Sequence, residues 1–285
     1  MGFWRGWLIH ERVFGAYIAC TLIRLWHAVG FPSVHTLLYA TALVSVAAAA
    51  SVTRERSVRA WRIRLGFYPV LTVILFVHLR WVSPLINDGK RDALLWETDR
   101  ILTGGSVSLM LEPLISPLLT EFSSFCYMFF MVYLAMGVLT YLFAGESLAR
   151  VFYAGLFSLY AIGYFGYTLV PAVGPYIVYA ARFSIPLKGY FMTDFLAACY
   201  AAGTNFTDIF PSLHVAASAF LLCFDMKWNR RRFRLCLVPC IGIWFSTVYL
   251  RYHYFTDVLA GFAAAAAALA IARMARRREE REGWK

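Results

Sequence analysis

Residues 210–224 read FPSLHVAASAFLLCF, a short polar turn that leads directly into an apolar run. Proline suits the first turn of a helix because its backbone angle is already helical, and a serine beside it can accept a hydrogen bond from an unpaired backbone N–H. We therefore expect a helix over 211–226 that starts at an interface. Residues 31–35, FPSVH, nearly repeat the first five letters and also precede an apolar run.

Apolar runs of this kind recur along most of the chain. Of its 285 residues, 61% are hydrophobic and 15% are charged, and the mean hydropathy is +0.62. A soluble globular protein carries more charge, and a helix needs about 20 apolar residues to cross a bilayer. The sequence predicts an all-α, polytopic membrane helical bundle. Its expected spans are 34–52, 66–85, 121–143, 150–170, 211–226, 234–251 and 256–273, with 13–30 either crossing or lying in the interface.

These spans suggest three parts of the chain. We expect a six-helix core over 66–273, preceded by an extension over 1–65 with one or two membrane helices. A basic tail over 274–285 follows the core.

The formal net charge of +11 comes from basic clusters between the apolar runs. Clusters of this kind are typical of membrane topology signals rather than of a nucleic-acid surface. The clusters at 53–64, 227–234 and 273–285 are each separated by an even number of expected spans. The positive-inside rule therefore predicts a cytoplasmic C-terminus and places the connections 86–120 and 171–210 on the extracytoplasmic side.

The chain has six cysteines and one glycosylation sequon. The cysteines show no paired C-x-x-C spacing, so we expect neither a disulfide framework nor a cysteine-bound metal. The sequon, Asn205-Phe206-Thr207, stands close to FPSLH, where a sugar would obstruct a site. We therefore expect it to be unmodified.

Two histidines are expected on the same side of the membrane. The helix that follows FPSLH carries the chain inward, and the next one returns it to HYFTD at 253–257. His253 and Asp257 are four residues apart and would share one face of a helix. The aspartate can fix the tautomer of His253 and leave its other nitrogen free towards His214. We predict His214, His253 and Asp257 as catalytic residues.

The other histidines have no such acidic partner. The apolar run after His35 contains no carboxylate, so we interpret His35 as an interfacial residue at a helix start. His10, His27 and His78 are interpreted as structural. His214 and His253 with Asp257 also form a set of ligands that a metal ion could use, and this alternative stays open.

The paired motifs resemble those of the type 2 phosphatidic acid phosphatase superfamily. FPSLH followed some forty residues later by HYFTD is similar to its second and third motifs, and YLRYHYFTD is especially similar to the inositol phosphorylceramide synthase branch. The resemblance implies that His253 is a nucleophile that takes the phosphoryl group, that Asp257 orients it and that His214 protonates the leaving alcohol. Ser212 and the helix start would bind phosphate, as anions favour helix N-termini. The resemblance implies no metal and no other cofactor.

The chain departs from the superfamily pattern where phosphate-binding cations are usual. VPAVGPYIVYAARF at 170–183 lacks the usual lysine and Arg-Pro, and Ser246-Thr247 replaces a Ser-Arg pair. Tyr176 follows Gly174-Pro175 where related chains often carry arginine. Because phosphoryl transfer needs positive charge at the phosphate, we predict that other residues bind the substrate, namely Tyr176, Arg182, Lys188 and Arg251.

The sequence therefore predicts an integral-membrane enzyme that acts on phospholipid headgroups, with a lipid or water as acceptor. Weaker cationic binding favours a phosphodiester, and so headgroup transfer, over hydrolysis of a phosphomonoester. Hydrolysis of lipid or polyprenyl phosphates is the alternative within this class. A non-catalytic lipid-binding or transport protein is the alternative from another class. A transport pathway would place charges near mid-span on several helices, whereas the predicted catalytic residues cluster at one interface.

Overall fold

The computed structural model describes residues 6–52, 57–203 and 205–283. Most of these residues are helical and none of them lies in a strand, so the predicted all-α bundle is confirmed. The basic residues Arg54 and Arg56 and the last two residues of the tail lie outside the described ranges. The helices are α1 (Ile9–Val29), α2 (Val34–Val52), α3 (Val58–Ile86), α4 (Asp92–Thr103), α5 (Val107–Met110), η1 (Glu112–Leu114), α6 (Pro117–Leu142), α7 (Glu146–Leu169), α8 (Pro175–Val178), η2 (Ala180–Arg182), α9 (Phe191–Gly203), α10 (Leu213–Trp228), α11 (Arg230–Tyr249) and α12 (Phe255–Glu282).

Five helices of the described chain are long and apolar enough to cross a membrane, namely α2, α3, α6, α7 and α12. The protein is therefore an integral, multi-pass membrane protein. The ambiguous segment 13–30 lies largely within α1, one continuous helix of 21 residues. The segments predicted as spans at 211–226 and 234–251 form α10 and α11, of which α10 has only 16 residues and α11 starts with RRRFR. The predicted basic tail is helical up to Glu282 as a continuation of α12.

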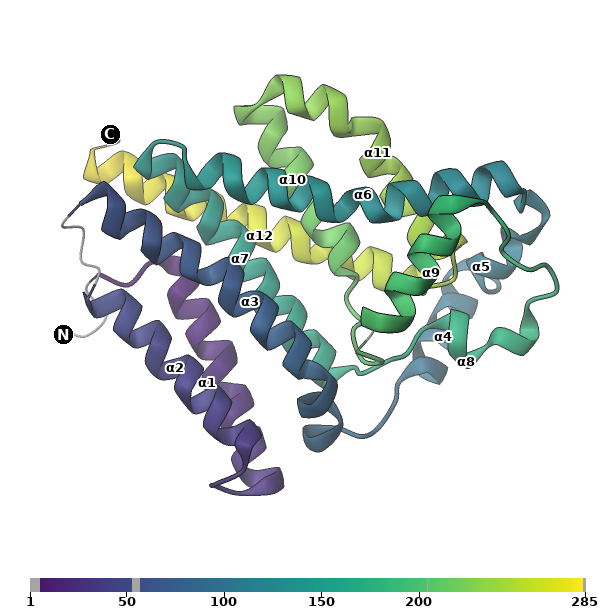
Figure 1. Cartoon of the computed structure of the whole chain (residues 1–285), viewed down its shortest axis with the longest axis horizontal. Helices are drawn as coiled ribbons and strands as arrows, with labels where there is room; N and C mark the ends of the chain where they lie inside the picture. Colours follow the sequence, from purple (N-terminus) through teal and green to yellow (C-terminus); the bar gives the residue numbers. More distant parts are fainter. Residues whose placement is uncertain (1–5, 53–56, 204, 284–285) are drawn as a thin grey trace.

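The bundle is built around α7, most of which is buried. In Figure 1 α6 and α12 run close to the long axis and α3 and α7 run obliquely to it, and α1 and α2 form a hairpin on one flank. Helix α12 packs along α7 and α10, and α1 packs on α7 and α2. Side chains of α1, such as Phe14 and Ile18, belong to the same apolar core as those of α7.

Glycines on α7 allow the FPSLH segment to approach its backbone closely. A Cβ at Gly163 would lie 2.5 Å from Leu213, and a Cβ at Gly166 would lie 2.5 Å from Pro211. Atoms of folded proteins do not pack at such distances. A larger residue at Gly166, where the Phe210 carbonyl oxygen is also only 3.0 Å away, would displace the turn. These contacts fix the position of the FPSLH turn along α7.

Short helices cover one end of the bundle, as Figure 1 shows for α4, α5, α8 and α9. Two carboxylates tie the segment after η2 to this end. Glu112 accepts from the Ile185 N–H at 3.1 Å, and Glu121 accepts from the Met192 N–H at 2.7 Å. The start of α11 and the end of α12, which are rich in arginine, lie at the opposite end of their helices.

Candidate active site

A backbone hydrogen bond joins the FPSLH turn to the start of α12. The Ser212 N–H donates to the carbonyl oxygen of Asp257 at 3.1 Å. The Ser212 hydroxyl caps α10 by accepting from the Val215 N–H at 3.5 Å, as expected for a serine before a helix. A Cβ at Gly261 would lie 2.7 Å from the carbonyl oxygen of Ser212. The two motifs meet because glycine lets the backbones of α10 and α12 come this close.

His214, the second residue of α10, is oriented by aromatic residues of α6. Its ring stacks on Tyr127 with 4.2 Å between ring centroids, and the Tyr127 hydroxyl lies 3.4 Å from Nδ1. The Phe130 ring lies 4.6 Å away on the same helix. The imidazole is only half-buried, so α6 fixes its orientation and leaves part of the ring accessible.

His253 lies in the turn between α11 and α12 rather than on a helix. The sequence suggested that His253 and Asp257 share a helical face, but α12 begins two residues after His253. The His253 N–H donates to the carbonyl oxygen of Thr247 at 3.0 Å. Arg251 has φ of 67°, in the left-handed region that few residues other than glycine adopt. This reversal of the chain, and not helical periodicity, directs His253 towards α10.

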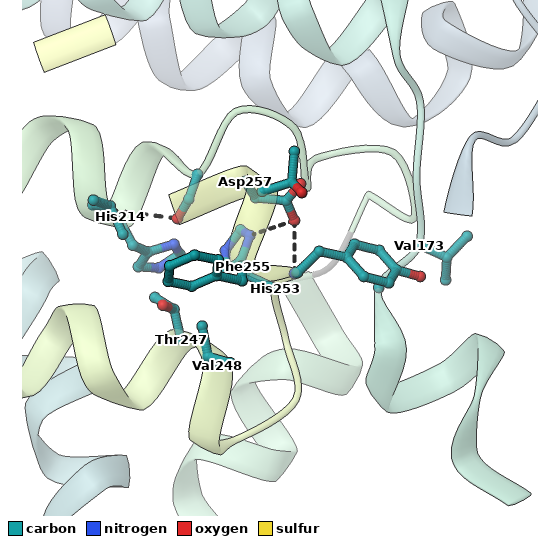
Figure 2. A network of polar contacts seen from close by, with 12 residues as sticks. Val173, His214, Thr247, Val248, His253, Phe255 and Asp257 are labelled. Atoms are coloured by element: carbon teal, nitrogen blue, oxygen red, sulfur yellow. Dashed lines mark hydrogen bonds and ion pairs between the residues drawn. The ribbon is translucent and has the colours of Figure 1, made fainter. Parts of the chain in front are cut away.

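The structure brings the three predicted catalytic side chains together. The ring centroids of His214 and His253 are 5.9 Å apart, with 63° between the ring planes. The Nδ1 atom of His253 lies 3.5 Å from Oδ2 of Asp257. In Figure 2 the ring of His253 lies between the ring of His214 and the carboxylate of Asp257. This order suits a nucleophile that has a carboxylate on one side and a proton donor on the other.

Burial keeps His253 uncharged at neutral pH. Only 2% of the residue is exposed. Burial lowers the pKa of His253 to about 4, against the opposing effects of the Asp208 charge and of the Ile209 backbone. Desolvation disfavours the charged form of a histidine. The neutral imidazole is the form that can attack phosphorus.

Two buried aspartates of α4 hold the segments on either side of the site. Asp99 accepts from the N–H groups of the first two residues of α12, both at 2.7 Å. Asp92 accepts from the Gly174 N–H and from the Tyr254 hydroxyl, both at 2.8 Å. Sequence reasoning treated 86–120 as a surface connection and missed both residues. The available signal was their spacing of seven, which puts two acids on one face of a helix.

Asp208 is a third carboxylate that sequence reasoning missed. It lies two residues before FPSLH, and burial raises its pKa. Its Oδ1 atom is buried without a hydrogen-bond partner in the described part of the chain. Of the side chains around His253, Asp208 has the strongest electrostatic effect on it. An acid placed directly before the turn was the signal in the sequence.

A metal ion was the alternative occupant of the site formed by His214, His253 and Asp257. Within residues 6–52, 57–203 and 205–283, no group of three or more His, Cys, Asp or Glu side chains converges closely enough to hold a metal ion.

Most of these residues fall within one match to a known family. The family model of the PAP2 superfamily matches residues 95–271, more than half of the chain. This chain belongs to the PAP2 superfamily. Neither the comparison with curated proteins nor the comparison with solved structures gives a match. The predicted superfamily is confirmed, and the similarity to the inositol phosphorylceramide synthase branch stays a prediction.

The predicted substrate-binding residues of this PAP2 protein differ in exposure and in their contacts. Tyr176 is exposed on α8, with its ring 5.4 Å from that of Tyr252. Arg182 and Lys188 are both exposed. Arg251 is buried, and its guanidinium donates to Glu112 at 3.1 Å and to the Ile185 carbonyl oxygen at 2.6 Å. Arg251 therefore ties residues 171–190, the covering segment, to the turn that carries His253.

His35 of this PAP2 protein, the histidine of the FPSVH copy, has a different partner. Nδ1 of His35 lies 3.0 Å from Nε2 of His78, so the FPSVH copy pairs with a second histidine on α3. His10 is fully buried edge-on against Tyr68. The Asn205 side-chain amide in the sequon is buried and donates to the Phe76 carbonyl oxygen at 2.8 Å.

Proposed function

We propose that this PAP2 protein is a membrane phosphotransferase that moves a phosphorylated headgroup from a phospholipid to a lipid acceptor through a phosphohistidine at His253. The observation that carries the proposal is the separation of 5.9 Å between the His214 and His253 ring centroids, with Asp257 next to the latter. One phosphate can contact both imidazoles at this separation. Membership of the superfamily supports lipid phosphatase or phosphotransferase chemistry in general.

In the first step the unprotonated nitrogen of His253 attacks phosphorus. A phosphorus–nitrogen bond forms, the bond from phosphorus to the leaving oxygen breaks, and protonated His214 donates its proton to that oxygen. Asp257 stabilises the positive charge that develops on the His253 ring. In the second step the acceptor hydroxyl attacks phosphorus, the phosphorus–nitrogen bond breaks, and His214 takes back a proton.

The start of α10 is suited to bind the phosphate oxygens. Unpaired N–H groups and the helix dipole favour an anion at a helix N-terminus. Ser212 lies there beside His214, completely buried. We assign Ser212 and these N–H groups to substrate binding, with the covering segment that includes Tyr176, Arg182 and Lys188 guiding the lipid.

We place the site on the extracytoplasmic side of the membrane. Helix α12 starts beside His253 and ends in a segment with many arginines, and α11 starts with arginines and ends near His253. Arginine-rich ends are retained on the cytoplasmic side. The C-terminus is then cytoplasmic, and the lipid enters from the outer leaflet.

The test is a product assay with purified protein and a labelled phospholipid. Transfer predicts a new labelled lipid, whereas the phosphatase alternative predicts release of inorganic phosphate or of a free headgroup phosphate. His253→Ala and His214→Ala should each abolish turnover and keep lipid binding. The exposed His27 offers a matched control, because His27→Ala changes the same residue type away from the site.

Acid-quenched samples should contain a labelled phosphohistidine that His253→Ala lacks. Normal turnover by either site variant would refute the proposed mechanism. Lipid binding without any product, in wild type and variants alike, would favour the non-catalytic alternative.

A further inference from the structure

Tyr127 of α6 lies outside both FPSLH and HYFTD but contacts His214 directly. The two rings stack with 4.2 Å between centroids and 29° between planes, and the Tyr127 hydroxyl lies 3.4 Å from Nδ1 of His214. Only 8% of Tyr127 is exposed. A buried tyrosine hydroxyl needs a hydrogen-bond partner, and among the described residues the His214 ring is that partner.

Contacts between α6 and α11 hold Tyr127 in place. One residue earlier, Cys126 packs on Gly242 of α11 so closely that a Cβ at this glycine would overlap the cysteine sulfur. The Tyr127 ring itself lies 5.1 Å from the ring of Tyr252, the residue before His253. The packing of α6 on α11 therefore places the Tyr127 hydroxyl relative to both segments that carry the predicted catalytic histidines.

The two histidines of the site have partners of different charge. Nδ1 of His253 lies 3.5 Å from the Asp257 carboxylate. In the described part of the chain no carboxylate forms an ion pair with His214, and its ring faces the neutral hydroxyl of Tyr127 instead. A carboxylate stabilises a protonated imidazole, whereas a neutral hydroxyl orients the ring and holds the proton on it less strongly. His214 is therefore suited to give up a proton and to take it back.

The hydrogen bond at Nδ1 decides which nitrogen of His214 can exchange a proton with the substrate, because the partner of one ring nitrogen sets the tautomer. If Nδ1–H donates to the Tyr127 oxygen, Nε2 of the neutral ring has a lone pair and can act as a base. If the tyrosine O–H donates to Nδ1, the ring proton lies on Nε2 and no lone pair is left. The second step of the proposed function needs the first arrangement.

We propose that Tyr127 is a positioning residue whose hydroxyl oxygen accepts a hydrogen bond from Nδ1 of His214 in both steps of the reaction. This inference rests on the proposed function and adds a residue to it. In the first step the Nε2–H bond of protonated His214 breaks, and the proton goes to the leaving oxygen. In the second step the acceptor hydroxyl gives its proton to Nε2. The Nδ1–H bond stays intact throughout.

Nitrogen-15 NMR of histidine-labelled protein in lipid nanodiscs tests the tautomer without any substrate. At about pH 8 an ordinary histidine is neutral, and the His214 signals are those that His214→Ala lacks. Wild type should show a protonated Nδ1 and an unprotonated Nε2. Tyr127→Phe keeps the stacked ring and removes the hydroxyl, so it should shift His214 towards the form with the proton on Nε2.

Tyr133→Phe is the matched control. It removes a hydroxyl from the same helix, one that donates to Asp225 at 2.8 Å, and it should leave the His214 signals unchanged. A wild-type His214 with its proton on Nε2 would overturn the inference, and so would an unchanged tautomer in Tyr127→Phe.

Turnover of two substrates gives a second readout. A labelled phosphodiester lipid has an alcohol leaving group that needs a proton, whereas bis(p-nitrophenyl) phosphate releases nitrophenolate, which needs none. General acid–base catalysis contributes about 10²–10⁴-fold, and loss of the positioning hydroxyl should remove about 10-fold from kcat for the lipid. The burst of nitrophenolate in Tyr127→Phe should keep its wild-type rate.

Equal losses with both substrates in Tyr127→Phe would assign Tyr127 to packing alone and would also overturn the inference. If the tautomer shifts as expected but wild type forms no product from either substrate, the proposed function fails and the hydrogen bond from His214 to Tyr127 stands.

Discussion

At the scale of single residues, the environment of His253 decides its chemistry. A histidine in water is half-protonated near pH 6.5. Burial lowers the pKa of His253 to about 4, and the nearby Asp208 opposes this shift. Asp257 lies 3.5 Å from Nδ1 and also accepts from the Tyr254 N–H at 2.9 Å. The ring is therefore neutral, with Asp257 beside it and the Asp208 charge acting on it. The spacing of residues in HYFTD does not predict this state.

The pKa of His253 predicts the acid limit of the reaction. His253 must be unprotonated to attack, so the acid-side decline of phosphohistidine formation should be centred around pH 4 rather than near the ordinary histidine value of about 6.5. Asp208→Asn removes a charge that raises this pKa, and the decline should move to lower pH. Rapid-quench measurement of the phosphohistidine at each pH, with circular dichroism to confirm folding, tests both points.

Asp88 is exposed in the loop before α4, so Asp88→Asn is the control for loss of a negative charge. A decline centred near pH 6.5 in the wild type would contradict the effect of burial on His253. An unchanged profile in Asp208→Asn would contradict the electrostatic role of Asp208.

At the scale of helices, α4 acts as a support for the start of α12. The carboxylate of Asp99 satisfies N–H groups that no helix partner can reach, at 2.7 Å for both Phe255 and Thr256. Asp92 supports the loop that ends at Gly174 in the same way. A helix outside the core thus holds Tyr254 and the start of α12, which directly follow His253 in the chain.

Asp99→Ala should loosen this support. Loss of a helix cap costs about 0.5–2 kcal/mol, so the melting temperature should fall. Because the cap lies beside His253, kcat should also fall, whereas Asp99→Asn should retain part of both because it keeps one acceptor oxygen. Thermal unfolding in detergent and the lipid product assay provide the measurements.

Glu97 is exposed on the same helix and pairs with Arg100, which makes Glu97→Ala the matched control. Equal losses in Asp99→Ala and Glu97→Ala would show that α4 has no special role at the start of α12.

At the scale of the whole molecule, the proposed site and a buried network around Asp225 lie at opposite ends of the bundle. The site lies at the end covered by the short helices in Figure 1. Near the other end of α10, the buried Asp225 accepts from Arg232 at 2.6 Å and from the hydroxyls of Tyr133 and Tyr141 at 2.8 and 2.7 Å. This network joins α6, α10 and α11. Its polar groups form hydrogen bonds with one another, so we interpret the network as a structural contact between the helices and not as a second site.

Arg232→Met should therefore affect stability and not chemistry. Removing one partner of a buried ion pair costs about 3–5 kcal/mol because the other charge is left unpaired. The melting temperature should fall clearly, while kcat/KM per folded molecule, measured well below that temperature, should stay at the wild-type value. The neighbouring Arg231 is exposed, and Arg231→Met should change neither quantity. A stable Arg232→Met protein with reduced kcat/KM would contradict the separation.

The covering segment belongs to this scale too. Glu112 accepts from the Ile185 N–H and pairs with Arg251, so it links the cover to the turn that carries His253. Arg251 was predicted to bind substrate because of its charge and its closeness to HYFTD. The contact with Glu112 depends on a residue 139 positions earlier in the chain, which sequence spacing could not reveal.

The amino-acid sequence by itself determined the class of the fold, the approximate helices and the three residues His214, His253 and Asp257. These follow from local properties, namely the length of apolar runs, the position of capping residues and the pairing of motifs across helices. Only the tertiary structure decided which groups surround those residues. Asp92, Asp99 and Asp208 belong to connections that were predicted only as extracytoplasmic segments. Their burial and charge depend on contacts between distant parts of the chain, because desolvation and Coulomb interactions act through space and not along the sequence.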